Sequence, residues 1–385
     1  MESPARSPTI EPGRRQQRLR IWFGCSNLAF FLYAGFCAAL TMAAYLRPLP
    51  TYDRYLYAGA VASLRYSDPV TLQRIARTEF DAQPAPFRFE NVTGEPYFAD
   101  VYNNPYHFVQ QLGLSRVKLG YVASGYVLWR AGLPILVSLR LISACSLLVV
   151  GFVLLAWTHD AVLSAVLLLT PPVLNMGRMV TGDPLSTAII VLALFALTKK
   201  GELLAAGLLI VSIFVRSDNV VLVLILITGM TWTQHLRFRI GGWCAALGVA
   251  TSAIVNRIAG IYGWRLLMQH SFVKPELEPV THPVLITFAG YLHALAGLRA
   301  IPYTFLTIWL LVASAVWRRL PEGSVLRDLL PVAGIYIVLR LLIFPNFDDR
   351  VFVWAYLIAG VALIQAAQSP RSDSATLGSE STSAG

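Results

Sequence analysis

The chain has 385 residues, of which 56% are hydrophobic and only 14% are charged, and its mean hydropathy is +0.59. Soluble globular proteins carry about 25% charged residues, so this composition argues against a cytosolic enzyme and against a disordered scaffold. A net charge of +10 in so apolar a chain fits a polytopic membrane protein with basic residues near lipid headgroups better than a nucleic-acid binder.

The N-terminal region divides into a basic tail and an apolar segment. Residues 1–20 contain five arginines, whereas residues 21–46 contain no charged residue. A membrane-spanning helix needs about 20 apolar residues, and the apolar part of a secretory signal has only about 7–15. The sequence therefore predicts a cytoplasmic tail followed by an uncleaved first span.

A long hydrophilic loop follows at residues 47–133, with nine Lys or Arg and seven Asp or Glu residues. Asp68-Pro69 and Asn104-Pro105 are typical helix starts, with an N-cap residue before Pro at the first helical position. Apolar residues at helical spacing follow each start. We expect short amphipathic helices that lie on the membrane surface.

Apolar runs then alternate with short polar loops, which predicts an all-α protein of about ten transmembrane helices. The further spans are expected at 134–157, 161–176, 184–198, 202–215, 219–234, 240–257, 301–317, 329–344 and 351–367. Several are short for a full crossing, which leaves room for one re-entrant segment. A single membrane domain at 21–367 would include a second large outer segment at 258–300 and precede a disordered cytoplasmic tail at 368–385.

The distribution of basic residues predicts the orientation of these spans. The short loops on the N-terminal side contain seven of them: Lys199, Lys200, Arg237, Arg239, Arg318, Arg319 and Arg327. Each short loop on the other side contains a single basic residue, namely Arg178, Arg216 or Arg350. The positive-inside rule therefore predicts that both termini lie in the cytoplasm and that the 47–133 loop faces outside, which for a bacterial inner (plasma) membrane protein is the periplasm.

Charged residues within or beside the apolar runs are costly and often functional. All of them are predicted to lie toward the outer ends of their spans: Arg140, Asp183, Arg216, Asp218, Arg340 and Arg350. Each also has a simpler interpretation. Arginines anchor helices at the membrane interface, and Asp183 before Pro184 is a good helix start. Their clustering on one side favours a polar cavity that opens outward.

The order of these features resembles the C-type glycosyltransferase superfold (GT-C), whose polytopic members take a sugar from a polyprenyl-phosphate carrier. That family has an acidic residue near the start of its first outer loop, and here the loop opens with TYDRY at 51–55. The phrase RLIS at 140–143 opens the second span. Asp183-Pro184 resembles the second acidic position of the family, and Arg216 matches a position that is often basic.

Two departures from the family pattern matter. Arg54 follows Asp53 where some subfamilies have an Asp-Glu pair, and no large C-terminal soluble domain is present. The second departure disfavours an oligosaccharyltransferase. The first leaves open whether the enzyme would need a metal, with a divalent cation possible at Asp53 and Asp183.

The resemblance implies a glycosyltransferase that moves a sugar to a periplasmic-side acceptor, which would be a glycolipid, a polysaccharide or a protein. Asp53 would act as general base and Asp183 as the second catalytic carboxylate. Guanidinium groups match phosphate in bidentate fashion, so basic residues would hold the donor phosphate: Arg178, Arg216 and Arg350, with Arg340 and Lys274 behind them. The residues expected at the acceptor are Arg54, Tyr52, Asp100 and His107.

Two other classes of function remain open from the sequence. A lipid or polysaccharide transporter, or a flippase, would favour inverted repeats and broken helices near the middle of the membrane. A non-catalytic protein of envelope assembly would also carry arginines on the outside. The position of Asp53 distinguishes them, because a glycosyltransferase needs Asp53, Asp183 and the outer arginines around one cavity.

Overall fold

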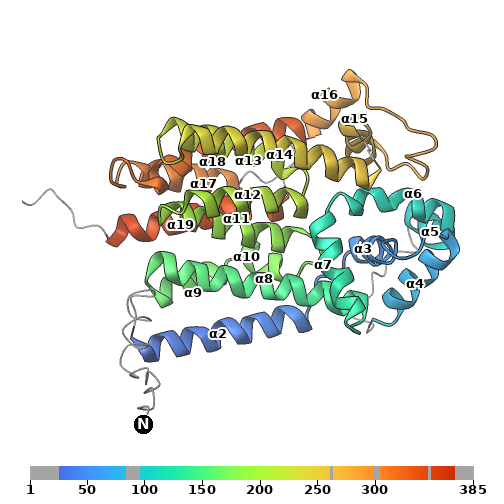
Figure 1. Cartoon of the computed structure of the whole chain (residues 1–385), viewed down its shortest axis with the longest axis horizontal. Helices are drawn as coiled ribbons and strands as arrows, with labels where there is room; N and C mark the ends of the chain where they lie inside the picture. Colours follow the sequence, from blue (N-terminus) through green and yellow to red (C-terminus); the bar gives the residue numbers. More distant parts are fainter. Residues whose placement is uncertain (1–25, 84–95, 261–262, 298–303, 346–347, 369–385) are drawn as a thin grey trace, which may run out of the picture.

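The computed structural model describes residues 26–83, 96–260, 263–297, 304–345 and 348–368, and the described residues are helical with no strand among them. Long helices lie side by side in a bundle, and a group of short helices covers one end of it (Figure 1). The helices of the bundle are α2 (Asn27–Leu46), α8 (Ile135–Thr158), α9 (Ala161–Leu168), α10 (Pro171–Arg178), α11 (Asp183–Thr198), α12 (Glu202–Val215), α13 (Asn219–Trp232), α14 (Phe238–Ala259), α17 (Thr304–Trp317), α18 (Val325–Ile343) and α19 (Asp349–Gln368).

Four of these helices, α2, α8, α14 and α19, are long and apolar enough to cross a membrane. Three shorter apolar helices, α11, α12 and α13, pack among them. The predicted span at 161–176 is instead a pair, α9 and α10, bent by 66°. Pro171 and Pro172 lack the amide donors that a continuous helix would need at the bend, so the chain breaks there.

The short helices form a cap with its own apolar core. They are α3 (Asp53–Ala62), α4 (Pro69–Asp81), α5 (Pro96–Asn103), α6 (Pro105–Arg116) and α7 (Leu119–Arg130). Both predicted helix starts in this segment are confirmed: Asp68 accepts a hydrogen bond from the Thr71 amide at 2.8 Å, and Asn104 accepts one from the Tyr106 amide at 2.9 Å. The helices pack on one another around buried tyrosine, phenylalanine and leucine side chains, which gives the cap a shared core.

Hydrogen bonds help to join the cap to its surroundings. The Glu79 carboxylate on α4 accepts hydrogen bonds from the amides of Ile135 and Leu136 at 3.1 and 3.2 Å, and so caps the start of α8. A later segment, with α15 (Gly263–Met268), the π-helix η3 (Gln269–Val273) and α16 (Phe288–Gly297), follows α14. The amide group of Gln111 on α6 donates to the carbonyls of Glu276 and Leu277, which holds this segment across the cap.

Gly59 sets how closely α3 approaches α6. A methyl group at this position would overlap the Phe108 ring and lie 2.8 Å from the Leu112 Cδ2 atom. Gly59→Ala should therefore lower the unfolding free energy by about 1–3 kcal/mol, measured by thermal unfolding of the purified protein in detergent.

The matched control for Gly59→Ala is Gly35→Ala on α2, where no atom lies within 4 Å of the added methyl group. This control should leave the melting temperature unchanged or slightly higher, because Ala favours the helix. Equal melting temperatures for the two variants would contradict the close α3–α6 contact.

Candidate functional site

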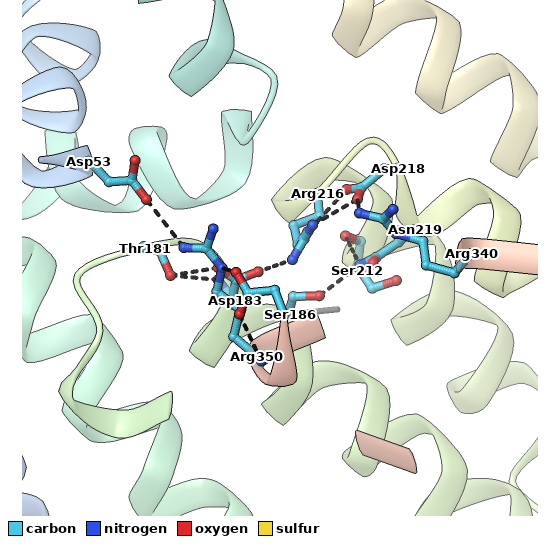
Figure 2. A network of polar contacts seen from close by, with 11 residues as sticks. Asp53, Thr181, Asp183, Ser186, Ser212, Arg216, Asp218, Asn219, Arg340 and Arg350 are labelled. Carbon is cyan, nitrogen blue, oxygen red and sulfur yellow. Dashed lines mark hydrogen bonds and ion pairs between the residues drawn. The ribbon is translucent and has the colours of Figure 1, made fainter. Parts of the chain in front are cut away.

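Five segments distant in the sequence bring charged side chains together at the end of the bundle that the cap covers (Figure 2). Asp53 begins α3, Asp183 begins α11, and Arg216 stands between α12 and α13. Arg340 lies in the last turn of α18, and Arg350 lies in the first turn of α19. They meet because antiparallel helices of the bundle start or finish at this level.

Asp183 is the most deeply buried member of the network, with 2% of its side chain exposed. One carboxylate oxygen accepts a hydrogen bond from the Thr181 hydroxyl at 2.7 Å, and the other pairs with a guanidinium nitrogen of Arg216. The Nε atom of Arg350 lies 3.8 Å from the carboxylate. The start of α11 adds the positive end of a helix dipole, so the buried negative charge is compensated from several sides.

Arg216 is held in a fixed orientation by a second carboxylate. Its Nε and Nη2 atoms donate to the two oxygens of Asp218 at 3.0 and 2.7 Å, a bidentate pair. Arg340 approaches the same carboxylate from α18, with Nη2 at 3.7 Å. Asn219 supports the turn by donating to the Ser186 hydroxyl at 2.7 Å and the Ser212 carbonyl at 3.0 Å.

Arg350 joins the cap to the bundle. Its Nη1 atom lies 3.2 Å from Asp53 Oδ2 on the cap, and its Nε atom lies 2.5 Å from Asp348 Oδ2. Since Arg350 also approaches Asp183, the two predicted catalytic carboxylates share one guanidinium group. Asp53 keeps more than a third of its side chain exposed and therefore remains accessible to a ligand.

The network surrounds a small cavity of about 80 Å³. Four cationic and two acidic side chains contribute to its lining: Lys118, Arg216, Arg340, Arg350, Asp183 and Asp348. Two further carboxylates, Asp53 and Asp218, bind these arginines from beside the lining. The volume admits a small anion or a few water molecules.

Two of the cations have donor capacity that the described residues leave unused. The Nε and Nη1 atoms of Arg340 are buried without a hydrogen-bond partner among these residues. Lys118 lies with its ammonium 5.1 Å from the centre of the Tyr57 ring and forms no salt bridge within the described part of the chain. Buried donors without acceptors cost about 1–3 kcal/mol each, so an anion in the cavity would relieve that cost.

Lys118 lies between α6 and α7, in the predicted outer loop. Desolvation by the surrounding protein lowers the pKa of its ammonium to about 8, and the nearby Asp53 opposes part of that shift. Lys118 is not among the site residues predicted from the sequence, because a single lysine in a polar loop forms no recognisable motif. Only the folding of α6 and α7 against the bundle directs it to the cavity.

Two residues expected at the donor phosphate lie elsewhere. Arg178 donates through Nε to the Arg47 carbonyl at 2.8 Å and through Nη1 to Asn175 at 3.3 Å, so it fastens the start of the outer loop to α10. Lys274 is exposed just after η3. The cavity lining includes neither side chain.

The four residues expected at the acceptor are also outside the cavity lining. Tyr52 is buried, with its ring centre 4.6 Å from that of Phe98, and Arg54 is only 1% exposed within the cap core. Asp100 is exposed on α5, and His107 lies 3.5 Å from Glu278. The structure therefore places these residues in the cap and outside the lining of the cavity.

Within the described residues, no group of three or more His, Cys, Asp or Glu side chains is placed to hold a metal ion. The pair suggested for a divalent cation, Asp53 and Asp183, is bridged by Arg350. The cationic groups that line the cavity fit an anionic ligand.

Asp183→Asn should destabilise the protein by about 3 kcal/mol, because it removes the most deeply buried carboxylate of the network and leaves Arg216 and Arg350 only partly compensated by their other carboxylate partners. Thermal unfolding in detergent measures the effect. Asp348→Asn removes a more exposed carboxylate from the same cavity and should cost about 1 kcal/mol or less. Equal losses in the two variants would show that Asp183 is not the central carboxylate.

Comparison with known protein families, with curated proteins and with solved structures found no match to this chain.

Proposed function

We propose that the protein is a membrane glycosyltransferase of GT-C type, which moves a sugar from a polyprenyl-phosphate donor to an acceptor on the periplasmic side of the inner membrane. One observation carries the proposal. Asp53, the expected base, is bound to Arg350, which lines a cavity together with Arg216, Arg340 and Lys118. A base beside a set of phosphate-binding groups is what glycosyl transfer from a lipid phosphate requires.

The arrangement of the bundle supports the predicted topology. If the bent pair α9–α10 counts as one span, nine further helices of the bundle would complete the ten predicted spans: α2, α8, α11, α12, α13, α14, α17, α18 and α19. The start of α2 and the end of α19 lie at the same end of the bundle, away from the cap (Figure 1). Both termini would then be cytoplasmic, and the cavity would face the periplasm.

The cationic groups would act on the leaving group. As the bond between the anomeric carbon and the phosphate oxygen breaks, negative charge grows on the lipid phosphate. Arg340 has two buried donors without a partner among the described residues, Lys118 adds a further cation to the lining, and Arg216 is held in place by Asp218. Fixed cationic donors in a partly buried site stabilise such developing charge without reorganising during the reaction.

Asp53 would act on the acceptor. Its carboxylate accepts the proton of the acceptor hydroxyl while that oxygen forms the new bond to the anomeric carbon, and the lipid phosphate departs with the electron pair of the old bond. The contact with Arg350 holds the Asp53 carboxylate beside the cavity that Arg350 lines. Asp183, buried behind Arg216 and Arg350, would position both arginines.

Asp53→Asn should abolish transfer, since an amide cannot accept the proton, while folding and membrane insertion stay intact. The lost ion pair with Arg350 is partly exposed, so its effect on stability should be about 1 kcal/mol or less. The assay uses membranes with a panel of radiolabelled polyprenyl-phosphate sugars and measures label in the acceptor fraction.

Asp68→Asn is the matched control for Asp53→Asn, because it removes an exposed carboxylate from the same loop and Asn also caps helices well. This variant should keep wild-type transfer. Near-normal transfer by Asp53→Asn would refute the base assignment. A wild-type protein that moves whole lipid-linked sugars across vesicles without transferring any would instead favour a flippase.

Lys118 predicts how donor binding depends on pH. The Lys118 side chain loses its proton, and with it its positive charge, as pH rises through about 8. The KM for the donor should therefore increase above that pH. Lys118→Arg keeps a cation at alkaline pH and should move the increase to higher pH. Lys118→Gln should raise KM below about pH 8 and remove the increase above it, and an unchanged pH profile in both variants would exclude Lys118 from the donor site.

A further inference from the structure

A second cavity, of about 570 Å³, lies at the opposite end of the bundle from the cap. Helices α8, α11, α13 and α19 end there and α18 begins there (Figure 1). None of its lining residues belongs to the network around Asp183. The lining includes Trp157, His159, Lys199, Lys200 and Ser324.

The balance of charge in this cavity favours an anion. Lys199 and Lys200 both contribute to the lining. Glu202 is the acidic side chain of the lining, and it is already engaged with the backbone amide and Nε atom of Arg237 at 3.0 and 3.2 Å. The lysines therefore have no free carboxylate within the lining to neutralise them.

The cavity also has hydrogen-bond donors without acceptors. Trp157 is only 4% exposed, and its indole N–H is buried with no partner among the described residues. Val325 and Leu326, the first two residues of α18, also contribute to the lining, and amides at that position have no carbonyl within their own helix. A helix start of this kind carries partial positive charge and binds phosphate readily.

Three helix ends that meet the cavity would oppose an anion through their carbonyl groups, and each is closed by a residue with left-handed backbone. These are His159, Lys200 and Gln234, with φ angles of 56°, 61° and 62°. They are the non-glycine residues of the described chain with positive φ, and all three line this cavity. The turn at Lys200 places a basic residue beside a helix carboxyl end, where it offsets the negative partial charge.

Exposed aromatic residues place this cavity at the level of lipid headgroups. Trp232, at the end of α13, is 86% exposed, and Phe238, at the start of α14, is 82% exposed. Gln234 and His235, which line the cavity, lie between them in the sequence. Large exposed aromatic side chains at helix ends are typical of the membrane–water interface.

We infer that this cavity binds a phosphate-bearing anion, held by Lys199, Lys200 and the donors at Trp157 and the start of α18, and that the headgroup of an anionic lipid supplies it. A small soluble phosphate compound has the same chemistry and would enter from the same side. The inference is independent of the proposed glycosyl transfer, because it uses none of the residues of that site.

The test is native mass spectrometry of the full chain in detergent, titrated with phosphatidylglycerol and, separately, with phosphatidylcholine. The variant K199Q/K200Q should bind phosphatidylglycerol about tenfold more weakly than wild type. The control R318Q/R319Q removes two exposed charges from the same end of the bundle but outside this cavity, and it should retain wild-type binding. Equal weakening in both variants would overturn the inference, as would equal binding of the two lipids by wild type.

Two further measurements separate the specific site from general surface charge. Trp157→Phe keeps the ring but removes the N–H donor, and it should weaken phosphatidylglycerol binding about threefold with no change in net charge. Competition with millimolar glycerol 3-phosphate identifies the source of the anion. If glycerol 3-phosphate displaces the lipid, the site binds a soluble phosphate; if the lipid stays bound, the site binds the headgroup. Unaltered phosphatidylglycerol binding by Trp157→Phe would contradict this placement of the anion.

Discussion

The arrangement of the outer end of the bundle depends on one buried carboxylate. Asp183 stands at the start of α11 and compensates two guanidinium groups, Arg216 from the α12–α13 turn and Arg350 from the start of α19. Charges buried in a medium of low dielectric constant need compensation, and Asp183 meets its guanidinium partners only when these three segments come together. The requirement aligns the ends of helices that are far apart in the sequence, and the polar cavity lies among those ends.

The apolar core of the cap extends onto Ile135, Leu136 and Leu139 of α8, and polar contacts add to this packing between the cap and the bundle. Glu79 caps the first amides of α8, and Asp53 reaches across to Arg350. A rigid cap core keeps Asp53 at a defined distance from the arginines of the bundle, while the partly exposed Asp53–Arg350 pair can open to a ligand at small cost. Under the proposed function, the cap would supply the proton acceptor Asp53 and the cation Lys118, and the bundle would supply the arginines.

Much of the architecture could be predicted from local sequence. Uncharged runs of sufficient length indicate helices, and an Asn or Asp before Pro indicates where a helix begins, as Asp68 and Asn104 show. The bend between α9 and α10 was not predicted, although Pro171 and Pro172 carry the signal. The cap core was also not predicted, because amphipathic helices have the same pattern whether they lie on a lipid surface or on one another.

The sequence by itself determined that this chain is helical and apolar, and that charged residues recur toward one end of its helices, because uncharged length and charge position are local properties. Only the tertiary structure decided which of those charges meet. Arg216, Arg340 and Arg350 reach the cavity, whereas Arg178 turns to a backbone carbonyl, since the direction of a side chain follows from the rotation and packing of its helix. Lys118 joins them because α6 and α7 fold back against the bundle, a long-range contact with no local signature.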